Sequence, residues 1–186
     1  MKEEKNTSSI LAITSNLAIM AFFSGLVIAM VYYVTAPVAK VKAEELRLAS
    51  MRELAKDADG FEDLKDKPGW VAATSKGSIM AYIVPSETKG YGGTMKLLVA
   101  VTKSGEVIDY TILSHNETPG LGDNAEKEPF RSQFKGKTAE DLEVVKDPSD
   151  KKHIQAMTGA TISSRAVTRA VKQAVEEVKF YRGDIK

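Results

Sequence analysis

The sequence predicts an α+β domain of antiparallel hairpins with flanking helices, preceded by a single N-terminal transmembrane helix. Three observations lead to this prediction. An apolar run without charged residues fills Ile10–Val34, glycine turns separate two pairs of apolar segments between residues 70 and 113, and Ser163–Tyr181 carries an amphipathic helical pattern. Hairpins that are flanked by helices, without βαβ alternation, are typical of the α+β class.

The N-terminal apolar run is long enough to cross a bilayer. As a helix, Ile10–Val34 spans roughly 37 Å, which exceeds a hydrocarbon core of about 30 Å. A cleaved signal peptide fits poorly, because the run is too long and Thr35-Ala36-Pro37 is a poor cleavage site. Tyr32 and Tyr33 stand where an interfacial aromatic belt is expected. We therefore expect residues 1–36 to be an N-terminal tail and an anchor retained in membrane lipid.

Small and polar residues interrupt this run at Thr14-Ser15-Asn16 and at Ser24-Gly25. Such residues are common where one membrane helix packs on another, and an asparagine in lipid is costly without a partner. They favour a helix that packs on another membrane helix, and a plain tether with tolerated polar residues is the alternative.

Charged, helix-prone sequence follows the anchor. In Lys40–Ala58 apolar residues recur near helical spacing, which predicts a helical stalk over residues 37–60 before a domain over residues 61–186. The basic residues on the two sides of the anchor, taken alone, slightly favour a cytoplasmic domain, although this rule weakens when a large domain follows.

Within the domain the apolar pattern changes to that of strands. Segments 70–74 and 78–84 flank Ser75-Lys76-Gly77, and segments 95–102 and 106–113 flank Lys103-Ser104-Gly105. Both pairs predict hairpins, because glycine supplies the positive φ of tight turns. We further expect a short helix over 124–132, a strand over 142–145, and a final helix over 163–181 for which Ser163 or Ser164 is available as a cap.

Composition excludes several kinds of chemistry. The chain has 26 Lys and Arg against 25 Asp and Glu and shows no dense basic run, so nucleic acid is not an expected partner. It has no cysteine, which removes disulfides, cysteine nucleophiles and iron–sulfur ligation. With two histidines, a multi-histidine metal site is not expected either, so redox chemistry would need a bound organic cofactor.

A phosphate-site pattern stands directly before the final helix. Thr158-Gly159-Ala160-Thr161-Ile162-Ser163-Ser164 combines a glycine, small residues and four hydroxyls with the start of a helix. Glycine permits close approach of the backbone, and the free amides and the positive end of the helix dipole favour an anion. The alternative from local chemistry alone is that Thr158 and Thr161 cap the helix.

A second pattern, His115-Asn116-Glu117-Thr118-Pro119-Gly120-Leu121-Gly122, follows a predicted strand. Pro119 stiffens this loop, and Gly120 and Gly122 allow the backbone to lie against a flat ligand. Glu117 and Thr118 offer hydrogen bonds to ring heteroatoms or ribityl hydroxyls, whereas Thr-Pro-Gly by itself indicates a turn. A third, glycine-rich pattern occupies residues 89–93 and offers either a contact through Tyr91 or a flexible approach to a hairpin.

These patterns together resemble the FMN-binding domain family, which the G subunit of the Rnf complex shares with the C subunit of the sodium-pumping NADH:quinone reductase. Thr158–Thr161 resembles the Ser/Thr-Gly-Ala-Thr signature, and Glu117–Gly122 resembles the Glu-Thr-Pro-Gly-x-Gly loop that precedes it. The resemblance implies FMN esterified through its phosphate to Thr161 by a flavin transferase that uses FAD. The cofactor-binding residues expected from it are Thr158, Gly159, Ala160, Thr161, Ser163, Glu117, Thr118, Pro119, Gly120, Leu121, Gly122 and Tyr91, with no catalytic or metal-binding residue.

The length favours the Rnf G subunit, and the resemblance then implies an electron-carrier subunit of an ion-translocating ferredoxin:NAD oxidoreductase. Its partners would be integral membrane and iron–sulfur or flavin subunits, and its flavin domain would lie outside the cytoplasmic membrane. The alternatives are the quinone-reductase C subunit, a membrane-tethered flavin-binding sensor, and a stand-alone reductase, for which the chain has little room. His115 could bond the flavin or fix its loop, His153 is expected at the surface, and Arg165 could neutralise charge or face solvent.

Overall fold

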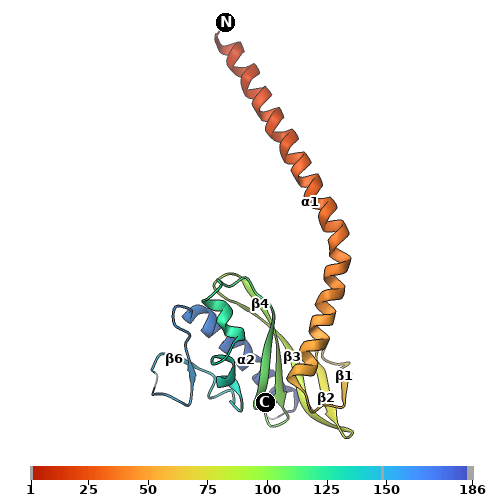
Figure 1. Ribbon diagram of the computed structural model, residues 1–186, viewed down its shortest axis with the longest axis vertical. Coiled ribbons are helices and arrows are strands. Elements are labelled where there is room, and N and C mark those ends of the chain that lie inside the picture. Colours follow the sequence, from red (N-terminus) through yellow and green to blue (C-terminus); the bar gives the residue numbers. More distant parts are fainter. Residues whose placement is uncertain (1, 148, 184–186) are drawn as a thin grey trace. The chain divides into compact units, whose positions relative to one another are not determined.

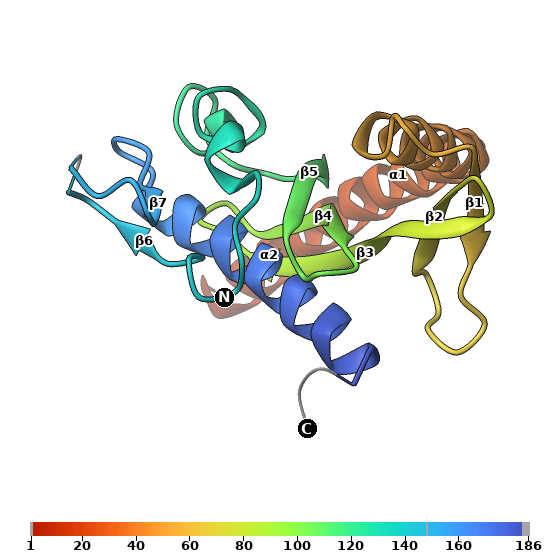
Figure 2. The same ribbon diagram turned by 90° about the horizontal axis from the view of Figure 1, so that it is seen from below.

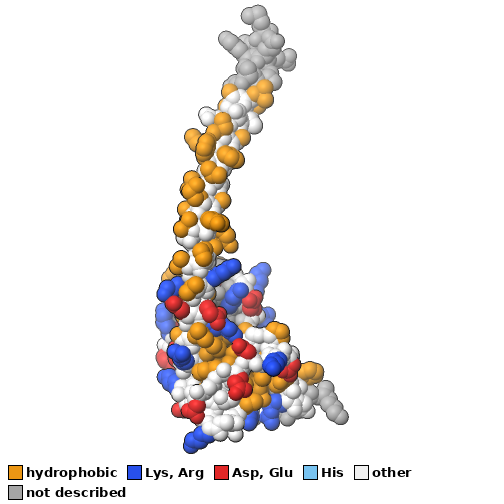
Figure 3. All heavy atoms as spheres, turned by 90° about the vertical axis from the view of Figure 1, so that its right-hand side faces the viewer, with side chains coloured by type: hydrophobic (Ala, Val, Ile, Leu, Met, Phe, Trp, Pro, Cys, Tyr) orange, Lys and Arg blue, Asp and Glu red, His pale blue; other side chains and the backbone are white. Residues whose placement is uncertain are grey.

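A computed structural model describes residues 2–147 and 149–183 and divides the chain into two compact units, residues 1–45 and 46–186. Helix α1 spans Lys2–Leu54 and continues through Pro37 (Figure 1). From Ile10 onward it is long and apolar enough to cross a membrane, with a mean hydropathy of 2.2 in its most apolar window and none of that window buried. In the space-filling view, apolar side chains cover this stretch, whereas Lys, Arg, Asp and Glu gather over the second unit (Figure 3).

The second unit is built on an antiparallel sheet whose five strands follow one another in chain order. These strands are β1 (Gly60–Asp63), β2 (Val71–Ser75), β3 (Ser78–Lys89), β4 (Thr94–Thr102) and β5 (Val107–Ser114). Two short 3-10 helices follow, η1 (Gly122–Glu126) and η2 (Arg131–Phe134), then the parallel pair β6 (Val144–Val145) and β7 (Ile154–Gln155), and finally α2 (Thr161–Tyr181). The predicted α+β class is thereby confirmed.

Both predicted hairpins are present, with Gly77 at φ +77° and Gly105 at φ +81° in their turns. Strand β3 runs further than the sequence indicates, past Pro85 to Lys89, because β4 pairs with it along that length. Its pairing with β2 stops at Ile83, so Pro85 lies in the part of the strand that pairs with β4 alone.

Alternation along the strands buries side chains on both faces of the sheet. Figure 2 shows α2 along one face and the C-terminal end of α1 toward the other. On β4, Leu97, Val99 and Val101 pack with α2, whereas Leu98 and Ala100 pack with Met51, Leu54 and Ala55 at the end of α1. Because side chains alternate across a strand, one nearly continuous apolar strand contributes to two separate clusters. The result is a three-layer arrangement of the end of α1, the sheet and α2.

Three expected elements differ in the structure. The helical stalk expected over residues 37–60 ends at Leu54, shortly before Asp57, Asp59 and Gly60, which are weak helix formers. In place of one helix over 124–132 there are two 3-10 helices, separated at Pro129, which disfavours helical geometry in the residue before it. The expected strand over 142–145 is reduced to Val144–Val145.

Candidate functional site

Three loops meet at the N-terminus of α2 and enclose a cavity of about 470 Å³. One loop joins β3 to β4, the second follows β5, and the third leads from β7 into α2. They bring together segments that lie far apart in the sequence. The lining residues are Tyr91, Glu117, Thr118, Leu121, Gly122, Gly159, Ala160, Thr161, Ile162 and Ser163.

The first turn of α2 presents its backbone amides without helical partners. The first helical hydrogen bond runs from the Ser164 amide to the Ala160 carbonyl at 2.9 Å, so the amides of residues 161–163 have no acceptor within the helix. Ala160 is the N-cap residue and no side chain caps the helix. The alternative that Thr158 and Thr161 serve as caps is therefore wrong for this helix.

Neither Ser163 nor Ser164, the two caps that the sequence offers, caps the helix, and both hydroxyls form other hydrogen bonds. The Ser164 hydroxyl donates to the Ala160 carbonyl at 2.9 Å and accepts the Met157 amide at 3.0 Å, which fixes the loop before the helix. The buried Ser163 hydroxyl donates instead to the Glu117 carboxylate. Within the described residues, the half-buried Thr161 hydroxyl on the cavity wall has no hydrogen-bond partner.

Glu117 is buried, with 6% of its surface exposed, and its carboxylate connects the loop after β5 to the loop between β3 and β4 and to the first turn of α2. The Gly92 amide donates to Glu117 Oε1 at 2.9 Å, and the Ser163 hydroxyl donates to Glu117 Oε2. Both oxygens are thus engaged by the protein. The sequence assigned this side chain to the ligand, whereas the structure shows it as a brace between loops that also lines the cavity.

Glycines surround this brace because no larger residue fits. A Cβ on Gly92 would overlap the Asn116 carbonyl, with its carbon only 2.6 Å away. A Cβ on Gly122 would lie 2.8 Å from Glu117 Cβ and 2.7 Å from Ser163 Oγ, and one on Gly90 would lie 2.7 Å from Met95 Sδ. Real Cβ atoms essentially never approach other atoms so closely. The glycine-rich loop therefore packs its backbone directly against the second loop.

His115 contacts the backbone of Glu117, whereas Gly92 and Ser163 contact its carboxylate. Its Nδ1 accepts the Glu117 amide at 3.0 Å, and its Nε2 lies 3.3 Å from Glu126 Oε1. An Nδ1 that accepts a hydrogen bond carries no proton, so the ring proton belongs on Nε2 and points to Glu126. Of the two roles that the sequence left open, the structure shows the one that fixes the loop.

The structure brings most of the expected binding residues to the cavity, but not all of them. Thr158, Pro119 and Gly120 are exposed and do not line it. Gly120 instead supplies the left-handed backbone of the turn, at φ +77°, and its carbonyl accepts the Asn124 side-chain amide at 2.9 Å. The sequence missed Ile162, which is 57% exposed and lines the cavity.

The charge of the cavity wall is unusual for an anion site. Among the residues that the structure describes, Glu117 is the one charged side chain in the lining, and no Lys or Arg contributes to it. Arg165, on the next turn of α2, is exposed and lies outside the lining. Nearby, a hydrogen bond from Lys127 holds the pKa of Asp123 below its usual value. The groups that the wall offers to an anion are therefore neutral hydroxyls and the free amides at the N-terminus of α2.

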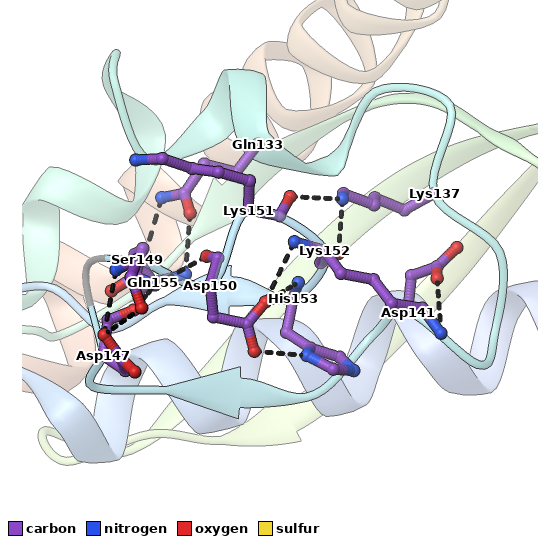
Figure 4. Close-up of polar contacts among 10 residues, drawn as sticks. All are labelled: Gln133, Lys137, Asp141, Asp147, Ser149, Asp150, Lys151, Lys152, His153 and Gln155. Atoms are coloured by element: carbon purple, nitrogen blue, oxygen red, sulfur yellow. Dashed lines mark hydrogen bonds and ion pairs between the residues drawn. The ribbon is translucent and has the colours of Figure 1, made fainter.

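A second cavity of about 320 Å³ lies beside η2 and the loop before β7. Lys137 Nζ donates to the carbonyls of Lys151 and Lys152, and His153 Nδ1 lies 2.7 Å from Asp150 Oδ2 (Figure 4). His153 is thus half-buried and paired, in contrast to the surface position expected from the sequence. These contacts hold the basic segment 151–155 in place.

Comparison with known proteins finds similarity over the region that forms the cavity. The family model described as FMN-binding domain matches residues 90–176, which contain all three loops. A Clostridium ljungdahlii protein, named as the G subunit of a proton-translocating ferredoxin:NAD(+) oxidoreductase complex, is 55% identical over 98% of this chain and 99% of that protein. An Acetobacterium woodii protein, named as the G subunit of the Na(+)-translocating complex, is 34% identical over 73% of this chain and 68% of its own length.

Among solved structures, the C subunit of a Na(+)-translocating NADH-quinone reductase from Parabacteroides distasonis shares the fold. It aligns with a TM-score of 0.50 and 24% identity, over 60% of this chain and 61% of that chain. This level of likeness concerns the fold alone.

Proposed function

This chain belongs to the family of G subunits of Rnf-type, ion-translocating ferredoxin:NAD(+) oxidoreductase complexes, and on that premise we propose that it carries FMN on Thr161 as a membrane-anchored electron carrier. The observation that carries the proposal is the Thr161 hydroxyl. It lies half-buried on the cavity wall, at the free N-terminus of α2, without a hydrogen-bond partner among the described residues.

The size and chemistry of the cavity suit FMN. Its volume of about 470 Å³ is in the range of small-molecule sites. Free amides at residues 161–163 offer donors to a phosphate, and the wall has no basic side chain from residues 2–147 or 149–183. A phosphate monoester carries a charge of about −1.5 to −2 at neutral pH, whereas a diester carries only one negative charge. A site with neutral donors and the Glu117 carboxylate therefore suits an esterified phosphate better than a free one.

FMN when bound would accept and release electrons, and the chain would hold and shield it. Tyr91, Leu121 and Ile162 expose 71%, 42% and 57% of their surfaces around the cavity, which gives a flat ring apolar contacts. The hydrogen bonds of Glu117 with Gly92 and Ser163 hold two of the loops and the first turn of α2 at fixed separation. In attachment, Thr161 Oγ would exchange its proton for a bond to the FMN phosphorus of FAD, and AMP would leave through the action of a flavin transferase.

The apolar part of α1 supports an anchor in the membrane. We propose that the flavin domain lies on the extracytoplasmic side, where a covalent bond would prevent loss of the cofactor. The partners would be the integral membrane subunits and the iron–sulfur or flavin subunits of the same complex, since a chain without cysteine cannot hold an iron–sulfur cluster itself. The high identity to a G subunit over nearly the whole chain favours this assignment over a quinone-reductase C subunit or a sensor.

The proposal is tested by flavin fluorescence in a denaturing gel, after coexpression of the full chain with a flavin transferase. Wild type is expected to fluoresce and Thr161→Ala to be dark. Thr158→Ala is the matched control, because Thr158 is an exposed threonine of the same loop that does not line the cavity. A dark wild-type band with an active transferase, or a fluorescent Thr161→Ala band, would contradict attachment at Thr161.

A further inference from the structure

We propose that His115 is a positioning residue for the FMN pocket, and that its neutral form holds the Glu117 brace in place while its protonated form releases it. This inference rests on the proposed function for its flavin consequence, and on the contacts of His115 for the rest. Only 19% of the His115 side chain is exposed, and both of its ring nitrogens have partners.

The two ring nitrogens of His115 have different hydrogen-bonding roles, since Nδ1 is an acceptor and Nε2 is a donor. Nδ1 accepts the Glu117 amide at 3.0 Å, a contact that requires an unprotonated nitrogen. Nε2 lies 3.3 Å from Glu126 Oε1 and carries the ring proton there. When a second proton binds, it binds at Nδ1, because Nε2 is already protonated. The Glu117 amide then faces a donor instead of an acceptor, and this hydrogen bond is lost.

Loss of the hydrogen bond between His115 and the Glu117 amide affects the pocket because it lets Glu117 move. The Glu117 carboxylate accepts hydrogen bonds from the Gly92 amide and the Ser163 hydroxyl. Its position therefore sets the distances between the loop after β5, the loop between β3 and β4, and the first turn of α2, all of which line the cavity. Gly90, Gly92 and Gly122 pack against this residue or its neighbour Asn116 without room for a Cβ, so a small shift of the backbone at residue 117 must move the loops that touch it.

The charged groups that face the imidazole belong to η1 and to the residue that follows it. Glu126 of η1 pairs directly with the imidazole, and Asp123 of the same element lies within its electrostatic reach, partly offset by Lys127, which pairs with Asp123 at 2.9 Å. Glu117, whose amide hydrogen-bonds to His115, is a further acidic residue beside the imidazole, and it is buried. The ordinary range over which histidine side chains change charge is about pH 5 to 8, and this sets the pH values at which the exchange of partners is tested.

Two substitutions separate the duties of His115. In His115→Asn, the side-chain oxygen stands near the place of Nδ1 and can accept the amide two residues on, as in an Asx turn, but it cannot be protonated. In His115→Gln, the longer side chain carries an amide toward Glu126 but leaves no acceptor near the position of Nδ1. Both variants are neutral and polar, so a difference between them reports the acceptor rather than the charge or the burial.

The test is amide-resolved hydrogen exchange of Glu117 in the full chain in detergent, without FMN, at about pH 8 and about pH 5.5, with intrinsic rates divided out. Protection in wild type is expected to fall roughly fivefold at the lower pH, the factor of one ordinary hydrogen bond. His115→Asn is expected to stay protected at both values, and His115→Gln to be unprotected at both. Equal protection of wild type at the two values, or equal behaviour of the two variants, would overturn the proposal.

A separate measurement tests whether protonation of His115 changes the protein around the flavin. The oxidised isoalloxazine ring does not titrate in this pH range, so its visible circular dichroism reports the protein around it. With FMN attached, this signal is expected to change with pH in wild type and to stay constant in His115→Asn. A constant wild-type signal would overturn the link between His115 and the pocket. Absence of FMN from the chain would overturn the proposed function and leave the exchange result standing.

Discussion

Ser163 on the first turn of α2 donates its hydroxyl proton to the carboxylate of Glu117, forty-six residues earlier in the chain, and both side chains are buried. This hydrogen bond joins the loop after β5 to the helix that begins at Thr161. A carboxylate beside the first turn of a helix also interacts favourably with the helix dipole, which stabilises a charge that burial would otherwise disfavour. The pocket therefore depends on this pair for its shape.

Substitution of Glu117 tests the brace. Glu117→Leu is expected to leave the Gly92 amide and the Ser163 hydroxyl without their partner and to lower the free energy of unfolding by about 2 kcal/mol. In Glu117→Gln the amide oxygen can still accept from Gly92, and the Ser163 hydroxyl can accept from the amide nitrogen, so the loss is expected to be smaller. Thermal unfolding of the full chain in detergent measures both, and an equal loss in the two variants would contradict the brace.

The glycines around Glu117 give a second prediction. Gly92→Ala and Gly122→Ala place a Cβ into occupied space and are expected to reduce flavin incorporation strongly. Gly120→Ala is the control, because its Cβ meets open space and its cost is limited to the left-handed φ of +77°. Flavin absorbance per chain, after coexpression with a transferase, separates the two kinds of change. Full incorporation into Gly92→Ala would show that the loops do not need this close packing.

Tyr110 gives a prediction for alkaline pH. It is fully buried, its hydroxyl donates to the Ala125 carbonyl, and burial raises its pKa far above the usual value near 10. Because the folded state keeps the phenol neutral, its contribution is complete below about pH 10 and decreases as the pH rises above the pKa of the unfolded chain. At neutral pH, Tyr110→Phe is therefore expected to have a lower free energy of unfolding than wild type. Between pH 9 and 11, however, its free energy of unfolding is expected to fall less with pH than that of wild type. Parallel losses in denaturant titrations would contradict this role.

The side of the membrane can be tested because the natural chain has no cysteine. A single cysteine at the exposed Lys103 position, in the turn between β4 and β5, is expected to react with a membrane-impermeant maleimide in intact cells. A cysteine at the Lys5 position, before the anchor, is expected to react only after lysis. The reverse pattern would place the flavin domain in the cytoplasm.

The sequence predicted those parts of the fold that local chemistry determines. Gly77 and Gly105 indicated both hairpin turns, and the apolar face of residues 163–181 indicated α2. Strand β1 was not predicted, because Gly60-Phe61-Glu62-Asp63 has one large apolar residue and becomes a strand through its pairing with β2. The far end of β3 was missed for a similar reason, since its pairing with β4 outweighs the local signal of Pro85.

At the site, the sequence identified the loops but not the contacts between them. Ser163 was expected as a possible cap, yet its hydroxyl reaches Glu117 in a loop that only the fold brings near. Ile162 was overlooked because it lies off the apolar face of α2 that packs on the sheet, and such a position normally faces solvent. Long-range partners of this kind leave no periodic signal in the sequence.

The most direct test of the central claim is the mass of one peptide. Trypsin cleavage after Lys152 and Arg165 releases residues 153–165, which contain Thr158, Thr161, Ser163 and Ser164 together. From chain purified with its native complex, this peptide is expected to carry the mass of FMN less one water, and fragment ions are expected to assign it to Thr161. An unmodified peptide from a flavin-containing complex, or an adduct on any of the other three hydroxyls, would contradict the account.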